Sequence, residues 1–180
     1  MVPEKFYSLL ILILSLEMVS DINEFFEPFT AEINIEKKTY YSNQSISQGL
    51  ISFQDNKFVY QLNDPMNQTI YGLKDQLIVQ DNDFKQVMIY NNSYNFLLSK
   101  VFDKQLTYAP VSCPEICFKA IINDESIKTS TVTAVNNKLA SMQIVDNQNQ
   151  VFFIKFSNLV YESTNISYVA PNDYQVISND

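Results

Sequence analysis

Histidine, the side chain that most often moves protons in enzymes, is absent from this 180-residue chain. Without imidazole there is no Ser-His or Cys-His couple for nucleophilic catalysis, and no histidine for a metal cluster. Pairs of carboxylates could still act as acid and base, but the acidic residues are scattered in segments such as Asp81-Asn82-Asp83, which favour solvated turns. We therefore expect a protein that is not an enzyme, with no metal site and no cofactor.

The two cysteines, Cys113 and Cys117, are the other residues with reactive side chains. In an exported protein they could form a local disulfide, which would constrain the unfolded chain only modestly because the loop is short. Two thiols are too few ligands for a zinc site, and their spacing departs from the Cys-x-x-Cys pattern of redox proteins. We expect the pair to be a local cross-link and not a requirement for folding.

The charge and composition narrow the class of protein further. The formal net charge is −8, the sequence pI is about 4.5 and every cation is a lysine, so nucleic acid is not an expected partner. Hydrophobic residues make up 46% of the chain and aromatic residues 13%, all of them Phe or Tyr. With no repeat or linker, this composition predicts one sheet-rich domain over residues 21–180, which we expect to be a monomer.

The amino terminus has the pattern of an export signal. A short segment ending at Lys5 precedes an apolar run from Phe6 to Leu16, which has the length of a signal-peptide core and is too short to span a bilayer. We expect residues 1–20 to be a signal peptide that is cleaved after Ser20, or else after Ser15. The alternative is an uncleaved helix that packs on the fold.

The segment between Ile46 and Tyr90 contains short strand patterns that are apolar on both faces. Leu50 and Ile51 are adjacent and therefore point to opposite sides of a strand, and the same doubling recurs along the chain. A sheet with one wet face should instead alternate between apolar and polar residues. The connections are too short for βαβ crossovers, so we expect a strongly curved sheet that is packed outside by a helix and encloses an apolar interior.

The elements follow from the periodicity and the turn signals. Ile22, Phe25, Phe26 and Phe29 have helical spacing, and Ser20 or Asp21 can cap a short helix that Pro28 discourages from continuing. The segment 95–102 interrupts the strand pattern and is expected to form a second short helix. Strands are expected at Phe29–Lys38, Ile46–Phe53, Lys57–Leu62, Thr69–Leu73, Gln76–Asp81, Gln86–Asn91, 116–122, 127–135, 138–145, 150–157 and 159–162.

Four motifs, in the same order along the chain, resemble those of the periplasmic outer-membrane lipoprotein carrier family (LolA). They are Phe29-x-Ala31-x-Ile33; Gly49-Leu50-Ile51-Ser52-Phe53 followed by Lys57-Phe58-Val59-Tyr60; Asp64-Pro65 followed by the strand pair within 76–87; and the terminal segment 166–177. Each motif alone is ordinary strand chemistry, but their shared order behind an export signal is more specific. The family often has an arginine where this chain has Gln54-Asp55-Asn56, and Lys57 could supply a charge there but not the forked hydrogen bonds of arginine.

The resemblance implies a fold that is mainly β with a few helices (α+β): an open, strongly curved antiparallel half-barrel closed by the N-terminal helix and a short lid helix. It also implies a periplasmic carrier, a chaperone that binds the acyl chains of lipoproteins in a hydrophobic cavity. Such carriers accept lipoproteins from an inner-membrane ABC-type release complex and pass them to an outer-membrane receptor. The expected lipid-binding residues are Phe25, Phe29, Phe53, Phe58, Tyr60, Leu77, Val79, Phe84, Tyr90, Phe96 and Leu97.

Other functions remain open at this point. The main alternative is a lipid-sensing or regulatory half-barrel domain of the cell envelope that has no transport activity. A surface protein or adhesin is a further alternative, since exported β-rich proteins are common. A lipoprotein receptor would itself need a lipidated cysteine at its mature terminus, and neither Cys113 nor Cys117 lies there.

Overall fold

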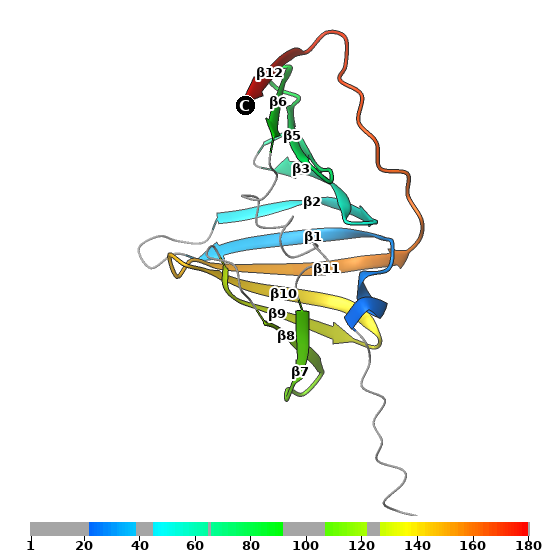
Figure 1. Cartoon of the computed structure of the whole chain (residues 1–180), viewed down its shortest axis with the longest axis vertical. Coiled ribbons are helices and arrows are strands. Elements are labelled where there is room, and N and C mark those ends of the chain that lie inside the picture. Colours follow the sequence, from blue (N-terminus) through cyan, green and yellow to red (C-terminus); the bar gives the residue numbers. More distant parts are fainter. Residues whose placement is uncertain (1–21, 39–44, 65, 92–106, 122–126, 180) are drawn as a thin grey trace, which may run out of the picture.

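The computed structural model describes residues 22–38, 45–64, 66–91, 107–121 and 127–179 of the chain. In these residues twelve strands form one sheet, in the spatial order β12-β6-β5-β4-β3-β2-β1-β11-β10-β9-β8-β7 (Figure 1). A 3-10 helix, η2 (Ile22–Phe26), precedes the first strand. The strands are β1 (Phe29–Lys38), β2 (Ser45–Gln54), β3 (Lys57–Asp64), β4 (Gln68–Gly72), β5 (Gln76–Asp81), β6 (Gln86–Asn91), β7 (Thr107–Val111), β8 (Ile116–Ile121), β9 (Ile127–Val135), β10 (Lys138–Asp146), β11 (Val151–Tyr161) and β12 (Gln175–Asn179).

The prediction of an α+β fold closed by helices is wrong. Within the described ranges the only helical element is η2, whose five residues form one 3-10 turn before Pro28, and isolated helices this short are not stable in water. The sheet is also not wholly antiparallel, because β12 pairs in parallel with β6. The predicted lid helix at 95–102 and the predicted signal peptide lie outside the described residues.

Asparagine-rich turns set the register of the central hairpins. Asp55 and Asn56 join β2 to β3 with φ angles of 50° and 62°, and Asn136 and Asn137 join β9 to β10 with 52° and 58°. Two consecutive residues with positive φ form the type I′ turn that matches the twist of a tight hairpin, and Asn and Asp tolerate this conformation better than other non-glycine residues. The turn chemistry visible in the sequence therefore places the apolar residues of these strands on one common face.

The sheet is strongly curved around the side chain of Phe26. Its ring lies 6.4 Å from that of Phe53 on β2 and 6.2 Å from that of Tyr108 on β7. Five strands separate β2 from β7, so a flat sheet would hold them roughly 29 Å apart at about 4.8 Å per step. The face that carries Phe29 and Phe53 is therefore concave, and we call it the inner face.

The outer face of the sheet is covered at one end by the chain itself. Residues 162–174, here called the C-terminal strap, run in extended form from the end of β11 to β12 (Figure 1). Tyr168 of the strap packs on Tyr71 of β4, with ring centroids 4.7 Å apart, and its hydroxyl donates to Gln80 of β5 at 3.2 Å. The expectation of a helix on the outside is wrong, because this strap takes its place over β4–β6.

Candidate functional site

Aromatic side chains line the inner face where the sheet is most curved. Phe29 and Phe53, neighbours on β1 and β2, are 0% and 1% exposed, with ring centroids 5.5 Å apart. Phe25 of η2 lies 5.9 Å from Phe118 of β8, and the neighbouring Phe26 lies 6.4 Å from Phe53 of β2, so the 3-10 helix joins the two halves of the sheet. The cluster is apolar and built from several distant segments, which makes it a surface suited to other apolar groups.

Strict alternation in β1 explains how the sequence builds this face. Phe29, Ala31 and Ile33 are buried on the inner face, whereas Thr30 and Glu32 point outward. Thr30 donates a hydrogen bond to the Glu162 carboxylate at 2.8 Å, on the outer side. The motif from which the resemblance was recognised therefore supplies the centre of the inner face.

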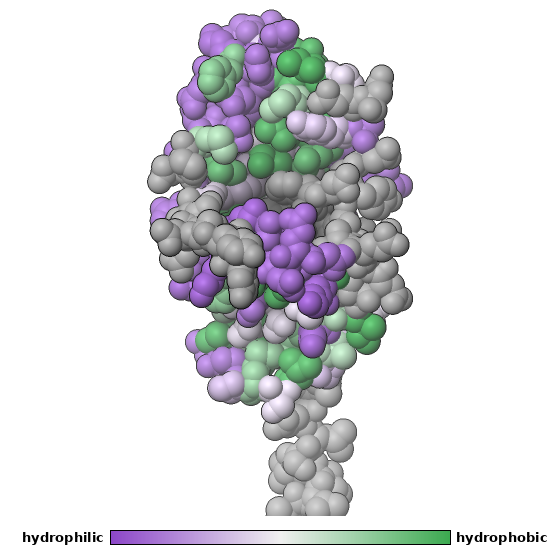
Figure 2. Space-filling model, turned by 90° about the vertical axis from the view of Figure 1, so that its left-hand side faces the viewer, coloured by the Kyte–Doolittle hydropathy of each residue, from purple (hydrophilic) through white to green (hydrophobic). Residues whose placement is uncertain are grey.

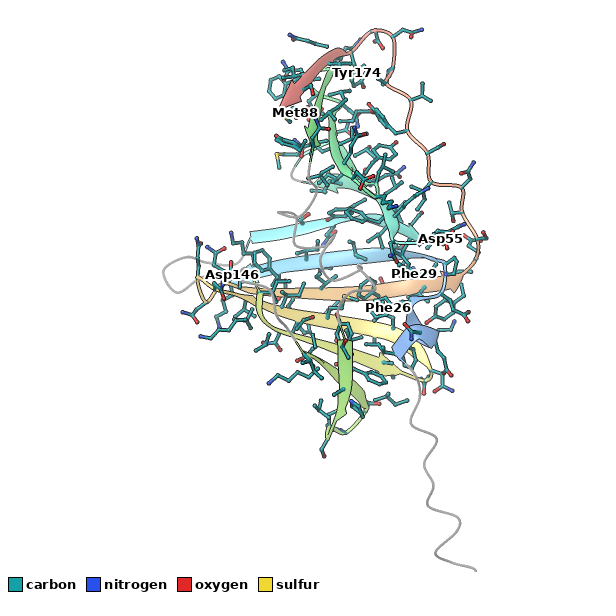
Figure 3. The ribbon with its side chains drawn as sticks, in the orientation of Figure 1. Phe26, Phe29, Asp55, Met88, Asp146 and Tyr174 are labelled. Atoms are coloured by element: carbon teal, nitrogen blue, oxygen red, sulfur yellow. A yellow bond between two sulfur atoms is a disulfide. The ribbon has the colours of Figure 1, made fainter. Side chains whose placement is uncertain are left out.

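The upper part of the inner face, on β5 and β6, is less enclosed. Leu77, Val79, Met88 and Tyr90 are cross-strand neighbours there and are all partly exposed. The Tyr90 hydroxyl donates to the Met88 sulfur at 3.5 Å. Figure 2, viewed from the side where Met88 projects in Figure 3, shows hydrophobic residues gathered over the upper strands. This is the accessible continuation of the aromatic cluster.

Both glycines of the chain lie where an inner-face ring crosses the backbone. A Cβ atom on Gly72 would lie within 2.0 Å of the Phe58 ring, and one on Gly49 would meet the Gln61 carbonyl and the Tyr60 ring. Tyr60 in turn shares a 2.8 Å hydrogen bond with the Ser47 hydroxyl. Burial raises the pKa of Tyr60, and the Ser47 hydrogen bond opposes that rise. The rings are thus held flat against the sheet.

The structure brings most of the predicted lipid-binding residues to one place. Phe84 does not join them: it is 76% exposed, in the turn between β5 and β6. The turn forms because Asp81 accepts hydrogen bonds from the backbone N–H groups of Asp83 and Phe84, both at 3.0 Å, which bends the chain away from the strand path. Phe96 and Leu97 lie outside the described residues. The remaining eight, Phe25, Phe29, Phe53, Phe58, Tyr60, Leu77, Val79 and Tyr90, lie on or against the inner face.

The second half of the sheet adds inner-face residues that the sequence reasoning missed. Phe118, Met142 and Ile154 are 3%, 0% and 1% exposed and belong to the same core. Their signal was the alternation in Ile116-x-Phe118-x-Ala120 and in β10 and β11. The predicted set came almost wholly from the first half of the chain because the motifs lay there.

Two hydroxyl groups interrupt the apolar inner face. Tyr108 of β7 and Ser130 of β9 carry buried hydroxyl oxygens that lie close to each other. Burial raises the pKa of Tyr108 to about 12, and the hydrogen bond with the Ser130 hydroxyl opposes that rise.

The outer face has a different chemistry. Two adjoining clefts of about 520 and 300 Å³ open over β1–β3 and β11, and both include Glu32 and Leu50. Most of the other side chains around them carry amides or hydroxyls: Thr30, Asn34, Gln48, Ser52, Gln61, Asn63, Ser157 and Asn158. A surface of this kind is suited to water and polar groups and not to a hydrocarbon chain.

Gln54, at the end of β2, holds the strap. Its side-chain oxygen accepts hydrogen bonds from the Thr164 backbone at 2.6 Å and from the Ser163 hydroxyl at 3.0 Å. On the other half of the sheet, Cys113 and Cys117 form a disulfide across the turn between β7 and β8, with 6.1 Å between their Cα atoms. In the described part of the chain, none of the helical segments is long and apolar enough to cross a membrane.

Comparison with known proteins gives matches of structure only. No family model matches the sequence, and no curated protein does. An uncharacterized conserved protein from Thermus thermophilus matches 87% of this chain and 93% of its own, with 13% identity and a TM-score of 0.51. A LolA superfamily protein from Nitrosomonas europaea matches 78% and 88%, with 9% identity and a TM-score of 0.48. A putative outer membrane lipoprotein-sorting protein domain from Vibrio parahaemolyticus also matches 78% and 88%, with 8% identity and a TM-score of 0.45.

The Thermus protein shares the fold of this chain over nearly its whole length. LolA superfamily and lipoprotein-sorting proteins are among the structural neighbours. What the inner face binds is a separate question, and it depends on the residues described above.

Proposed function

We propose that this protein binds the acyl chains of lipids or lipoproteins against its inner face, outside the cytoplasm in the cell envelope. The observation that carries the proposal is the set of partly exposed apolar residues on the inner face of β5 and β6, which continues the packed aromatic core around Phe26, Phe29 and Phe53. An acyl chain offers no hydrogen-bonding group, so its site must be apolar and adaptable. Met88 at the accessible end suits this role because its side chain adjusts to ligands of different shape.

The free energy of exposing an acyl chain to water is large enough to require a protein that covers the chain. Burial of one CH₂ group is worth about 0.8 kcal/mol, so a sixteen-carbon chain exposed in water costs on the order of 12 kcal/mol. A lipid-modified protein that crosses an aqueous compartment therefore needs a partner that covers its chains. The inner face supplies apolar area on side chains that are already ordered, which keeps the entropic cost of binding low.

The specific role we propose is that of a periplasmic lipoprotein carrier. In this role the protein takes lipoproteins from an inner-membrane ABC-type release complex and delivers them to an outer-membrane receptor. The support is the order of the four motifs: the apolar residues of the first, Phe29, Ala31 and Ile33, all lie on the inner face.

Photocrosslinking tests the binding function directly. Palmitate with a diazirine at its chain end should label inner-face residues of β5 and β6, such as Val79 and Met88. Val79→Gln should reduce labelling several-fold, because it puts an amide against the hydrocarbon. Val59→Gln is the matched control, since Val59 is also partly exposed but lies on the outer face. Equal losses in the two variants, or labelling confined to Leu50 and Val59, would reject the proposal.

Depletion of the protein in its host tests the carrier role separately. Outer-membrane lipoproteins should then accumulate in the inner membrane, and the Val79→Gln variant should fail to restore their sorting. Correct sorting in a depleted strain whose protein still labels with palmitate would leave a lipid-binding protein that is not a carrier.

A further inference from the structure

Two exposed apolar side chains lie at one end of strands β3–β6. Phe84, in the turn between β5 and β6, is 76% exposed, and Met66, in the loop between β3 and β4, is 48% exposed. The two connections are neighbours, because the start of β4 pairs with the end of β5. We call residues 66–67 and 82–85 the apolar tip. Large apolar side chains that lie together on an exposed end of a protein indicate contact with another apolar surface.

Hydrogen bonds within the tip occupy its backbone donors. The Asp81 carboxylate accepts hydrogen bonds from the N–H groups of Asp83 and Phe84, both at 3.0 Å. The Asn82 N–H donates to the Asn67 carbonyl at 2.9 Å, and the side-chain amides of these two residues share a hydrogen bond of 3.0 Å. Three consecutive N–H groups are therefore paired inside the protein. Unpaired N–H groups are what makes an irregular backbone costly in a membrane, so the tip can approach lipid without that cost.

The charges of the tip do not favour anionic lipid. Lys85 is the only cation in residues 66–67 and 82–85, and its ammonium already pairs with Asp173 of the strap at 2.8 Å. Asp83 adds a carboxylate beside Phe84, and the whole chain has a formal net charge of −8. Attraction to anionic headgroups depends on clustered lysine or arginine near the surface. Any lipid contact of the tip must therefore rest on its apolar side chains.

We propose that the apolar tip docks on a lipid bilayer and inserts Phe84 and Met66 into its interfacial layer. A protein partner fits less well, because a specific protein interface buries about 800 Å² on each side and two side chains at a turn do not supply such an area. Shallow insertion into lipid has no such threshold, since its strength grows with the apolar area that enters. The inference does not depend on the proposed acyl-binding function.

The tip adjoins the less enclosed part of the inner face. Val79 and Met88 form a cross-strand pair two positions before the last pair of the β5–β6 hairpin, a distance of roughly 7 Å at about 3.4 Å per residue. A membrane that holds the tip therefore lies beside the partly exposed apolar residues of these strands. The two surfaces are close but separate, so a substitution in one can leave the other intact.

A single tryptophan tests the proposal, because the chain has none of its own. With phosphatidylcholine vesicles, the emission of Phe84→Trp should shift to shorter wavelength and be quenched by lipids brominated on their acyl chains. Val160→Trp is the matched control: Val160 is 52% exposed, but it lies on β11, opposite Thr30 and five strand positions from β5. The control should show neither change. Addition of phosphatidylglycerol should not strengthen the binding.

Flotation with the same vesicles measures the contribution of each side chain. Phe84→Asn should lower the partition coefficient about fivefold or more, and Met66→Asn about two- to fivefold, because less apolar surface leaves water. Phe84→Leu keeps an apolar side chain and should retain most of the binding. Both positions are exposed, so these variants should fold. Palmitate labelling of Val79 should be unchanged in Phe84→Asn.

The outcomes decide between a bilayer and other partners. Equal emission changes in the two tryptophan variants, or no change in either, would overturn the docking of the tip on lipid, as would flotation that survives Phe84→Asn and Met66→Asn. An emission shift that rises with protein concentration in the absence of vesicles would assign the tip to a second copy of the chain. Vesicle binding that persists in Val79→Gln, where palmitate labelling is lost, would support a tip that acts apart from the acyl site.

Discussion

The two faces of strands β4–β6 are both apolar, but they are covered in different ways. On the outer face, Ile78 and Val87 are 3% and 0% exposed and lie in the part of the sheet that Tyr168 of the strap covers. On the inner face of the same strands, Val79 and Met88 remain partly exposed. One apolar surface is thus closed by the strap, whereas the other keeps partly exposed apolar residues.

The polar atoms around each surface reinforce this difference. On the outer face, two hydrogen bonds hold the strap to the sheet. The Tyr168 hydroxyl donates to Gln80 at 3.2 Å, and the Tyr174 hydroxyl donates to Asn82 at 3.1 Å. On the inner face of the same strands, Val79 and Met88 have no such segment of the strap over them and remain partly exposed. The contacts of the strap are therefore explained by folding, and the inner face is the candidate for binding.

The largest expected effect comes from the centre of the inner face. Phe53→Ala should lower the free energy of unfolding by about 3–5 kcal/mol, because it leaves a cavity against Phe26 and Phe29. Leu50→Ala, on the same strand but 47% exposed on the outer face, should cost less than about 1 kcal/mol. Urea unfolding of both variants checks the contrast. Similar losses would show that curvature does not concentrate stability on the inner face.

A smaller effect is expected from overpacking the same face. Gly72→Ala should destabilise the fold by about 1–3 kcal/mol, since the new methyl group would clash with the Phe58 ring. The double variant Gly72→Ala with Phe58→Leu should recover part of that loss, because leucine has no ring to displace. Urea unfolding of the single and double variants measures the coupling between Gly72 and Phe58. Strictly additive losses would contradict the contact between these two residues.

The strands of the first half could be predicted from the sequence because short-range signals fix them. β1, β5 and β6 occur with the predicted bounds, and Asp55-Asn56 forms the turn predicted between β2 and β3. The nature of the first helix could not be predicted in this way. The spacing of Ile22, Phe25 and Phe26 suits an α-helix, but with Pro28 so near it yields only a 3-10 turn.

The sequence correctly predicted that both faces of the upper strands are apolar, but the expected cover of the outer face, a helix, was wrong. Adjacent apolar residues such as Leu77 and Ile78 point to opposite faces, so both faces of the strand must be covered. The pattern does not say which segment of the chain covers each face. The strap that covers Ile78 lies about ninety residues away in the chain, and its contact is made by tyrosines in an extended segment without strand periodicity. Strands β7 and β12 were not predicted either. β7 contains Pro110, and β12 is short and parallel at the edge of the sheet.

Loss of the outer contact should have a moderate effect on stability and none on binding. Tyr168→Ala removes an aromatic pair with Tyr71 and should cost about 1–2 kcal/mol. Tyr168→Phe keeps the ring and removes only the hydrogen bond to Gln80, so its cost should be clearly smaller. Palmitate labelling of Val79 should be unchanged in both variants. A loss of labelling would show that the two faces are coupled and would break the comparison.

The smallest effect should come from Asp81, at the end of β5. Its pKa is lowered chiefly by the hydrogen bond from Gln68, at 2.9 Å, and also by those from the Phe84 and Asp83 backbone, while desolvation opposes the shift. Because the folded-state pKa lies below the ordinary value of 3.8, the carboxylate stabilises the fold at pH values above 3.8. That contribution is lost as the pH falls through the lower folded-state pKa. Asp81→Asn should therefore be less stable than the wild type at pH 7, by an amount that shrinks with acidification.

Urea unfolding between pH 7 and pH 2.5 measures this difference. Asp75→Asn, the same change at an exposed residue in the preceding turn, is the matched control for the substitution itself. A stability gap for Asp81→Asn that stays constant down to the lowest pH would mean that the shape of the side chain holds the turn and not its charge. The charged form matters here because the turn bends Phe84 away from the inner face, so its loss in acid should loosen this turn before it affects the aromatic cluster.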